Sequence, residues 1–243
     1  MFVHVPVYAL SRALIFPPPD HAVDGLLAVG GDLSPGRLLL AYASGIFPWY
    51  DDGLPILWHS PDPRCVLLVD ELHVGRSLRR VIAKGTFEVR FDGAFEQVIR
   101  ACKETPRVGQ DGTWITDEME DAYCRLHEMG YAHSVEAWRE GRLAGGLYGV
   151  SLGHVFFGES MFSHEPNASK VALVALAQRI AGWGFRLIDA QVPTPHTLAM
   201  GAQEWPRARF LDVLRSELAH PTRRGSWAQP EPPLEAYPRI SAR

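Results

Sequence analysis

The fold is decided by residues 131–192, which read YAHSVEAWREGRLAGGLYGVSLGHVFFGESMFSHEPNASKVALVALAQRIAGWGFRLIDAQV. Runs rich in β-branched and aromatic residues, joined by short turns at Gly141 and Gly153, predict strands that pair as an antiparallel meander. A longer apolar segment with helical spacing follows Asn167, which is expected to cap it. The stretch therefore predicts three strands, a helix and a further strand, over 131–138, 143–152, 154–162, 168–181 and 186–192.

A meander, a crossover helix and one more strand make an α+β arrangement, in the order found in the acetyltransferase-like (GNAT-like) fold. We therefore expect a mixed, mostly antiparallel sheet. A coenzyme A acetyltransferase would need a glycine-rich loop before the helix, of the form Arg/Gln-x-x-Gly-x-Gly, whose backbone N–H groups hold pyrophosphate. Residues 167–170 read NASK, and no such loop precedes them. We therefore expect no cofactor, and an acyl donor other than acetyl coenzyme A.

The helix expected over 72–84 has two contrasting faces. Val74, Leu78 and Val81 form an inward apolar stripe, and the other side carries four cations. These cations are Arg76, Arg79, Arg80 and Lys84. No acidic residue lies between positions 76 and 84. Such a face is either an ordinary solvated surface or a contact for a phosphate backbone.

Other elements flank these segments. Residues 65–69 have the apolar character of a buried strand. Asp92 is expected to cap one helix, and Thr116 to start the next. A last helix is expected over about 207–219, and the polar, proline-rich chain after Pro221 is expected to be loose.

The first 62 residues differ from the rest in composition. The chain contains 22 Gly and 19 Pro, and their excess lies in this region. Ser34 and Pro35 suit the start of a short helix that stops near Gly45. We therefore expect a small, irregular N-terminal domain over 1–62, followed by a catalytic domain over 63–243 with a loose C-terminal tail.

The composition also excludes several classes of protein. With 24 basic and 28 acidic residues among 243, the net charge of −4 excludes a globally basic nucleic-acid binder but permits a local basic patch. No apolar run approaches the roughly 20 residues that span a bilayer, and the N-terminus lacks the features of a signal peptide. Three cysteines without a Cys-x-x-Cys pair do not make a disulfide framework, and the ten histidines show no His-x-x-x-His or clustered metal spacing. We expect a cytoplasmic protein with neither a membrane partner nor a metal site.

Two polar residues interrupt the apolar strand near residue 190. Asp189 and Gln191 are two positions apart, so both are expected to point to the same face. A buried carboxylate is costly unless it is paired, and a carboxylate with an amide could orient an ammonium group and relay its proton. The alternative is a strand-end Asp that bonds a neighbouring loop.

Glu159 is a second acid among aromatic residues, in the stretch FFGESMFS at 156–163. Simple alternation is expected to place Phe157, Glu159 and Met161 on one face, and the other residues of the strand, Phe156, Gly158, Ser160 and Phe162, on the opposite face. Glu159 could bind a cation, such as a substrate amine, or it could form a salt bridge with a nearby Arg.

Three tryptophans, Trp49, Trp58 and Trp114, lie in segments expected to be loops. Tryptophans in loops can stack on nucleic-acid bases. Alternatively, they fill the seam between the two domains.

Eight ordered blocks of this sequence resemble the leucyl/phenylalanyl-tRNA–protein transferase family, over nearly the whole chain up to about residue 212. The blocks are GLLAVGGDL (25–33), GIFPW (45–49), WHSPDPR (58–64), GTWIT (112–116), GGLYGV (145–150), FGESMFS (157–163), NASK (167–170) and LIDAQ (187–191).

The resemblance implies an activity. Enzymes of this family transfer Leu or Phe, and Met less well, from its tRNA ester to the N-terminal Arg or Lys of an acceptor protein. The resulting peptide bond creates a bacterial N-degron for an ATP-dependent Clp protease. The resemblance also implies a small N-terminal domain and an acetyltransferase-like domain that uses aminoacyl-tRNA in place of acetyl coenzyme A.

Site residues follow from the same resemblance. It implies that Asp189 and Gln191 are the catalytic pair, that Trp49 and Trp114 lie near the terminal adenosine of the tRNA, and that the four-cation face contacts tRNA. It implies an aminoacyl pocket of seven residues: Leu147, Phe156, Gly158, Glu159, Leu176, Ile180 and Ile188. Two departures from the family pattern are Leu147, where a Met is expected, and His59, where a second Trp is common.

Two rival functions stay open at this point. A small-molecule acyltransferase on the same fold would bind acetyl coenzyme A, and the missing glycine-rich loop argues against it. A non-catalytic RNA-binding module would bind tRNA without turnover, and polar residues beside an apolar pocket argue against that.

Overall fold

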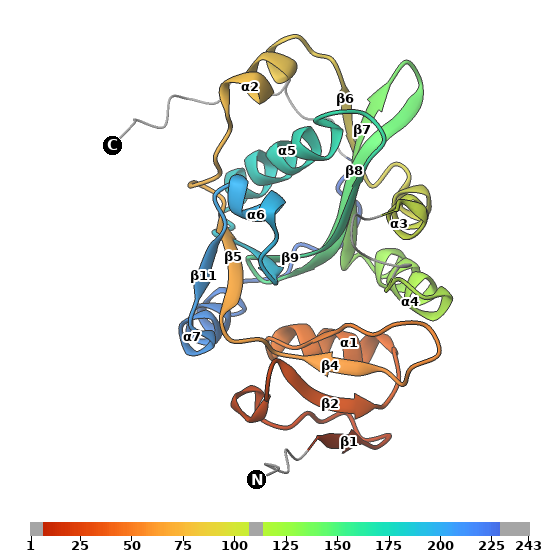
Figure 1. The fold of residues 1–243 in the computed structure, drawn as a ribbon, viewed down its shortest axis with the longest axis vertical. Coiled ribbons are helices and arrows are strands. Elements are labelled where there is room, and N and C mark those ends of the chain that lie inside the picture. The colour runs from red at the N-terminus through yellow and green to blue at the C-terminus, as the bar shows by residue number, and fades with distance from the viewer. Residues whose placement is uncertain (1–6, 107–113, 229–243) are drawn as a thin grey trace.

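The structure is a computed structural model in which residues 7–106 and 114–228 are described. It contains a small and a large β-sheet, drawn one below the other in Figure 1. The small sheet has four strands in the order β1-β2-β4-β3: β1 (Tyr8–Leu10), β2 (Leu26–Gly30), β4 (Leu57–His59) and β3 (Phe47–Pro48). The expectation of an irregular N-terminal region is therefore wrong. Strands this short cannot display an alternating pattern, so periodicity along the chain does not reveal them.

The large sheet has seven strands in the order β11-β5-β10-β9-β8-β7-β6. They are β5 (Arg64–Leu68), β6 (Glu88–Phe91), β7 (Ala132–Arg139), β8 (Arg142–Leu152), β9 (Val155–Ser163), β10 (Leu187–Gln191) and β11 (Gln203–Trp205). Among the described strands of this large sheet, β9 and β10 alone pair in parallel, since the helix between them returns the chain across the sheet. The predicted α+β fold with a mixed, mostly antiparallel sheet is confirmed, and so is the meander.

Helices cover both faces of the large sheet (Figure 1). On one face lie α5 (Ala168–Gly182) and α2 (Arg76–Ala83), and on the other lie α3 (Phe95–Glu104) and α4 (Asp117–Glu128). The small sheet carries α1 (Pro35–Ala43) and the short 3-10 helix η1 (Pro19–His21). After β10 come α6 (Pro195–Ala199) and α7 (Arg207–Glu217). No helix within residues 7–106 and 114–228 is long and apolar enough to cross a membrane.

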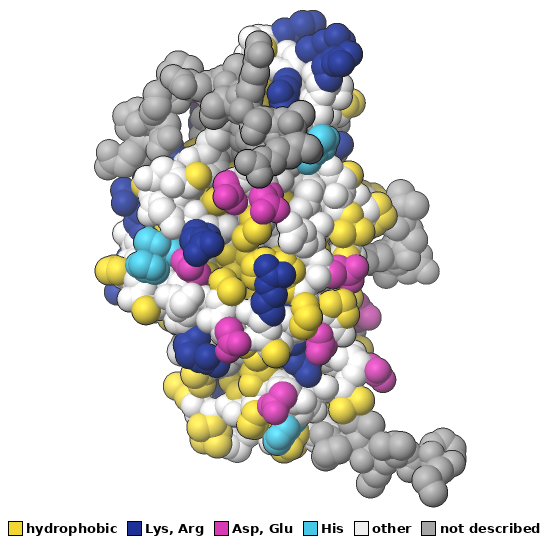
Figure 2. Space-filling view, turned by 90° about the vertical axis from the view of Figure 1, so that its left-hand side faces the viewer, with side chains coloured by type: hydrophobic (Ala, Val, Ile, Leu, Met, Phe, Trp, Pro, Cys, Tyr) yellow, Lys and Arg dark blue, Asp and Glu magenta, His cyan; other side chains and the backbone are white. Residues whose placement is uncertain are grey.

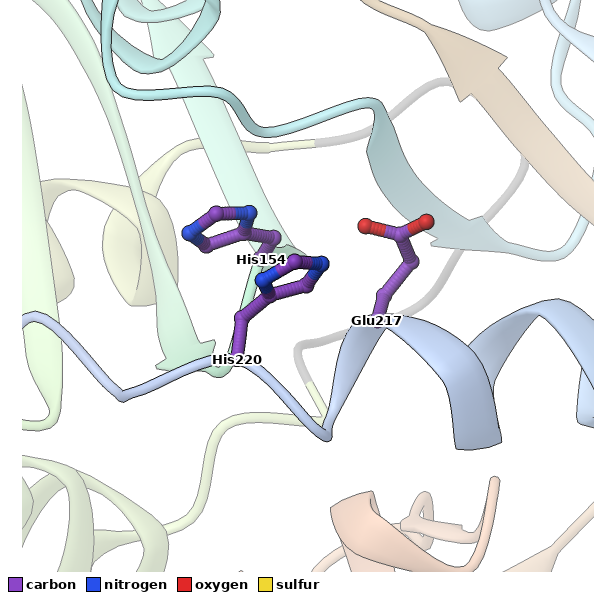
Figure 3. Close-up of side chains that lie close together, drawn as sticks. All are labelled: His154, Glu217 and His220. Atoms are coloured by element: carbon purple, nitrogen blue, oxygen red, sulfur yellow. The ribbon is translucent and has the colours of Figure 1, made fainter.

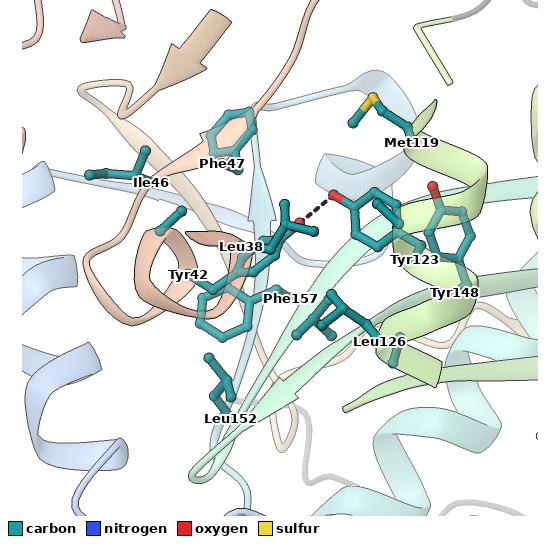
Figure 4. Packing of buried hydrophobic residues seen from close by; sticks show 14 of the residues in the cluster. Leu38, Tyr42, Ile46, Phe47, Met119, Tyr123, Leu126, Tyr148, Leu152 and Phe157 are labelled. Carbon is teal, nitrogen blue, oxygen red and sulfur yellow. Dashed lines mark hydrogen bonds between the residues drawn. The ribbon is translucent and has the colours of Figure 1, made fainter. Parts of the chain in front are cut away.

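One hydrophobic core continues from the small sheet into the large one. Leu38 and Tyr42 of α1 pack with Tyr123 of α4 and Phe157 of β9 (Figure 4). The rings of Tyr42 and Phe157 are 5.1 Å apart, and the hydroxyls of Tyr42 and Tyr123 are hydrogen-bonded. The first 60 residues therefore contribute side chains directly to the interior beneath β9.

Several predicted helix starts need correction. The helix expected from residue 72 begins at Arg76. Asp92 caps no helix: it has a φ of 53°, and its carboxylate accepts hydrogen bonds from the backbone N–H groups of Ser134 and Trp227. Asn167 precedes α5 in the left-handed conformation, and its side chain makes no capping bond. Thr116 does cap its helix, by accepting the N–H of Met119.

The chain after Pro221 is expected from its sequence to be loose, but the described part of it, residues 222–228, is docked on the protein. Trp227 is 2% exposed, and its indole stacks on the ring of His133 at 3.7 Å. A large aromatic side chain supplies enough buried apolar surface to dock an otherwise polar segment. Residues 229–243, the rest of the expected loose tail, lie outside the described residues.

Candidate active site

A cavity of about 720 Å³ opens beside β9 and β10, and it is lined mainly by apolar side chains. Six of the seven expected pocket residues line it: Leu147, Phe156, Gly158, Glu159, Leu176 and Ile188. The seventh, Ile180, is fully buried in the apolar cluster around α5 and does not reach the cavity wall. An apolar hollow with a few polar groups is the usual form of a small-ligand site.

A β-bulge in β9 determines which side chains face this cavity. The pairing register shifts where Tyr148 lies opposite Ser160 and Gly149 lies opposite Gly158, so Glu159 is the extra residue. As a result, Phe156 and Phe162, which simple alternation places on one face, pack into two different core clusters. Phe157 and Met161, the other expected pair, are also divided between these two clusters. The faces expected from simple alternation are therefore wrong beyond Gly158.

A second bulge, in β10, separates the two polar residues of that strand. Asp189 lies opposite Val66, and Gln191 lies opposite Cys65. Cys65 and Val66 are adjacent residues of β5, and their side chains pack into different core clusters. Gln191 has a φ of 61°, a left-handed conformation that non-glycine residues seldom adopt. Gln191 lines the cavity, and Asp189 does not. The expectation that both side chains share one face is therefore wrong.

Asp189 is bound by Arg64, which the sequence reasoning did not single out. The Arg64 Nε and Nη2 donate to the two carboxylate oxygens of Asp189 at 2.8 and 2.6 Å, and neither residue is more than 1% exposed. The Arg64 Nη1 also donates to the carbonyl of Gly45. Asp189 Oδ1 in turn accepts the backbone N–H of Gln191 at 3.0 Å. The carboxylate thus holds the bulge that presents Gln191 to the cavity.

Glu159 is the centre of a buried polar chain. The hydroxyl of Tyr123 donates to Glu159 Oε2 at 2.8 Å, and the side-chain amide of Gln191 donates to Glu159 Oε1 at 2.8 Å. Tyr42 extends the chain through its hydrogen bond to Tyr123. Burial raises the pKa of Glu159 to about 7, against the lowering effect of its hydrogen-bond donors.

This arrangement can handle an amine. The Gln191 amide N–H is used by Glu159, which leaves the carbonyl oxygen of the same amide as an acceptor at the cavity. A carboxyl group with a pKa near neutrality can take up or release a proton at physiological pH. The sequence reasoning missed both tyrosines, because nothing in the spacing of Tyr42 and Tyr123 marks them as neighbours.

His196 is a further polar residue of the cavity wall that the sequence reasoning missed. Burial, with the nearby Lys170, lowers its pKa, so its imidazole is neutral at physiological pH. The cysteines offer no comparable chemistry: burial raises the pKa of Cys65 and of Cys124 to about 11, which keeps both thiols protonated.

Two of the three tryptophans reach the cavity. Trp49 and Trp114 both line it, and Trp49 is 39% exposed. Trp58 instead lies in β4, fully buried, and its indole N–H donates to the carbonyl of Gly30. The ring of His59 is held by the backbone, since its Nε2 lies 3.0 Å from the carbonyl oxygen of Trp49. The stacking candidates are therefore Trp49 and Trp114.

The four-cation face lies apart from the cavity wall, on α2 and the residue after it. Arg76, Arg79, Arg80 and Lys84 are all exposed, while Leu78 is buried beneath them. Lys and Arg side chains gather at the upper end of the molecule in Figure 2, the end at which Figure 1 draws α2. Arg79 differs from the others, because its Nε donates to the carbonyl of Val74 and so fastens the start of the helix.

The start of α5 is built differently from a pyrophosphate loop. Its entry residue Asn167 is left-handed, and the N–H of Ser169 is directed at the Ser163 hydroxyl at 3.3 Å. A bound pyrophosphate would need such N–H groups free. These residues do not fit the usual cofactor of acetyltransferases.

Comparison with known proteins adds to this geometry. The family model described as leucyl/phenylalanyl-tRNA protein transferase matches residues 66–215, and the model of that family's N-terminal domain matches residues 31–62. The chain is 61% identical to a leucyl/phenylalanyl-tRNA–protein transferase from Myxococcus xanthus, over 93% of this chain and 97% of the relative. It is 56% identical to one from Xanthomonas oryzae, over 92% of this chain and 90% of the relative.

Solved structures resemble the chain only weakly. An aminoglycoside acetyltransferase from an uncultured soil sample, in complex with sisomicin, matches with a TM-score of 0.36 and 15% identity, over 55% of this chain and 88% of that one. L-PGS from Bacillus licheniformis matches with a TM-score of 0.39 and 12% identity, over 78% and 59%. The sequence matches, in contrast, cover nearly the whole chain at high identity, and they show that it belongs to the leucyl/phenylalanyl-tRNA–protein transferase family.

Proposed function

We propose that this chain transfers Leu or Phe, and Met less well, from aminoacyl-tRNA to the N-terminal Arg or Lys of acceptor proteins. The product would be a bacterial N-degron, made in the cytoplasm where aminoacyl-tRNA is found. Family membership supports aminoacyl transfer from tRNA to protein. The observation that carries the assignment to this site is the Glu159–Gln191 pair, set in the wall of an otherwise apolar cavity.

The apolar wall suits the side chain of the donor amino acid. Leu147, Phe156, Leu176 and Ile188 are buried and line the cavity. They offer no hydrogen-bond partner to a polar side chain, which disfavours a polar amino acid. A pocket of this kind separates Leu from Met poorly, because one methylene is worth only about 1–3 kcal/mol.

The polar pair suits the two amines of the reaction. We assign the α-amine of the donor to Glu159, whose buried carboxyl group is the acid of the cavity wall. We assign the α-amine of the acceptor to the carbonyl oxygen of Gln191. An α-ammonium group has a pKa of about 8, so it must lose a proton before it attacks.

In the reaction, the acceptor nitrogen forms a bond to the ester carbonyl carbon of the aminoacyl-tRNA. The bond from that carbon to the ribose oxygen of the terminal adenosine then breaks. The nitrogen loses a proton and the ribose oxygen gains one, so no redox partner or external energy source is required. Because the ester is already activated, orientation of the two reactants can supply most of the rate.

Asp189 would act as a positioning residue. Both of its oxygens are bonded to Arg64, and its side chain does not line the cavity, so it does not meet a substrate there. Its bond to the N–H of Gln191 fixes the left-handed backbone from which the amide reaches Glu159.

The tRNA would be held by two separate features. Trp49 and Trp114 are available to stack on bases at the cavity, a contact worth about 1–3 kcal/mol per base. The exposed cations Arg76, Arg80 and Lys84 are available to a phosphate backbone farther away.

The test is transfer of labelled Leu from Leu-tRNA to a peptide that begins with Arg. We expect Gln191→Ala to lower kcat by about 10²-fold, the loss that follows when a reactant is misplaced by roughly 1 Å. Full activity in a chain with both Asp189→Ala and Gln191→Ala would refute the assignment of the site. Binding of Leu-tRNA without any transfer by the wild-type chain would refute the proposed activity.

A further inference from the structure

Three side chains with metal-binding groups meet where the turn between β8 and β9 touches the end of α7 (Figure 3). His154 comes from the turn, Glu217 is the last residue of α7, and His220 follows three positions later. One ligand atom of each lies within 4.8 Å of the ligand atoms of the other two. None of the three lines the cavity of the candidate active site.

The donor set points to a borderline-soft divalent metal. Two imidazole nitrogens and one carboxylate oxygen are ligands that Zn²⁺ takes in four-coordinate sites, with a water molecule in the fourth position. Ca²⁺ and Mg²⁺ prefer sites made only of oxygen atoms. Ligand atoms of a zinc site lie about 2.0–2.2 Å from the ion, so binding would draw these three groups closer together. His220 is exposed, and its ring already stacks on that of His154 with the ring centres 4.0 Å apart.

The burial of Glu217 and the lack, among the described residues, of a hydrogen-bond partner for one of its oxygens are an independent reason to expect a cation. Its side chain is 6% exposed, and among the described residues its Oε2 has no hydrogen-bond partner. Its other oxygen is 3.9 Å from the Arg186 guanidinium, whose side chain is 76% exposed. A buried carboxylate oxygen without a partner costs free energy, and a metal ion on the side of the histidines would remove that cost.

The surroundings of His154 resemble the outer shell of a metal ligand. Its ring lies within reach of the backbone carbonyl of Gly184, and it stacks on Phe185 at 5.2 Å and on His220 at 4.0 Å. Metal-bound histidines commonly donate their second ring N–H to a backbone carbonyl, which fixes the tautomer.

The backbone brings the two segments together independently of any ion. The N–H of His154 donates to the carbonyl of Glu217 at 3.1 Å, and the N–H of Gly153 donates to the Thr222 hydroxyl. Gly153 has a φ of 53°, and a Cβ there would lie 2.4 Å from the Glu217 carbonyl oxygen. The close approach therefore requires glycine, and it sets the three ligands in place before metal binds.

From these observations we propose that His154, Glu217 and His220 form a binding site for Zn²⁺. The ion would fasten the chain after α7 to the β8–β9 turn. The sequence carried one signal for it, the Glu-x-x-His spacing of Glu217 and His220, which recurs in helical metal sites. The third ligand comes from a turn about 60 residues earlier, so spacing alone could not find it.

The test uses the full-length chain without a polyhistidine tag, freed of metal by a chelator and titrated with zinc chloride in a calorimeter. We expect one Zn²⁺ per chain. We expect His220→Asn to weaken binding by at least about tenfold, since even loss of an outer-shell partner costs roughly 10–100-fold. His73→Asn, at another exposed histidine, is the matched control and should bind like the wild type.

Two further measurements distinguish this site from a thiolate site and from non-specific binding of cations. The thermal unfolding midpoint should rise with Zn²⁺ in the wild type and in His73→Asn, should not rise in His220→Asn, and should not respond to Mg²⁺. Bound Co²⁺ should show visible bands without the near-ultraviolet thiolate band that a cysteine ligand would add. No binding by the wild type, equal binding by His220→Asn, or a thiolate band would overturn the proposal.

Discussion

Arg64 donates two hydrogen bonds to the carboxylate of Asp189, which lies 125 residues later in the sequence, and both side chains are buried. The pair joins the first strand of the large sheet, β5, to the strand that carries Gln191, β10. The guanidinium carbon of Arg64 also lies 4.8 Å from the ring centre of Phe47 and 4.6 Å from the ring centre of Phe210. The ion pair thus links the small sheet, the large sheet and α7.

Removal of one partner should be costly. We expect Asp189→Ala to lower the free energy of unfolding by about 3–5 kcal/mol, because it leaves the Arg64 guanidinium buried without a counter-charge. Urea unfolding monitored by circular dichroism measures the change. Glu88→Ala, which breaks the exposed pair with Arg90, is the control and should cause no measurable loss. A loss from Asp189→Ala no larger than that of the control would contradict the argument.

Glu159 should make stability fall as pH rises toward neutrality. Its pKa is raised by burial from 4.5 to about 7, so between these values the unfolded chain binds fewer protons than the folded chain. The free energy of unfolding should therefore decrease between about pH 4.5 and pH 7, by about 3 kcal/mol from this group. Glu159→Gln should abolish that component, whereas Glu140→Gln, at an exposed turn, should leave it unchanged. If the free energy of unfolding depends on pH equally in the wild type and in Glu159→Gln, then Glu159 does not contribute this pH dependence.

The basic face should determine the salt dependence of tRNA binding. We expect the combined substitution of Arg76, Arg80 and Lys84 by Gln to weaken tRNA binding. The slope of log affinity against log salt should become shallower by about 0.7–0.9 for each phosphate that the variant no longer neutralises. Arg79 is left in place, because it anchors the helix start.

A matched control removes three exposed cations from elsewhere, by substituting Arg100, Arg142 and Arg215, each of which already faces an acid. In the control variant, the slope of log affinity against log salt should stay close to that of the wild type. Filter binding over a range of salt concentrations measures both, and equal slopes for the two triple variants would show that α2 does not contact the tRNA.

The cavity wall should set the preference among donors. Leu147→Ala enlarges the cavity, so we expect kcat/KM for Phe-tRNA relative to Leu-tRNA to rise by about tenfold, within the range that one or two methylenes can supply. Ile180→Ala removes a similar buried side chain that does not reach the wall. It should lower stability without changing the ratio. A similar change of the ratio in both variants would show that general loosening, rather than cavity size, alters the preference.

The meander and the crossover helix could be predicted because the long strands and α5 have clear apolar periods. The predicted cavity residues follow instead from the resemblance to the family. Prediction from the sequence failed on the faces of β9 and β10. A bulge inserts one unpaired residue, and nothing in FFGESMFS or LIDAQ shows where the register shifts. The assignment of Glu159 to the cavity holds because the bulge occurs at that residue.

Partners far apart in sequence escaped prediction for a different reason. Arg64 and Tyr42 reach Asp189 and Tyr123 only through the tertiary fold, and no local pattern encodes that proximity. The boundary at residue 62 stays a prediction. The catalytic roles of Asp189 and Gln191 stay predictions too, and the substitutions above test them.

The hydrogen bond from Tyr42 to Tyr123 has a consequence for how this chain can be altered. Residues 31–62 and 66–215 match two separate family models, yet the hydroxyl chain that ends at Glu159 begins in the first of them. Because the two segments share this hydrogen-bonded chain and one core, we expect them to unfold in a single transition. A chimera that joins the N-terminal segment of a relative to residues 66–215 of this chain would keep the hydrogen bond to Tyr123 only if that relative also supplies a tyrosine at the position of Tyr42.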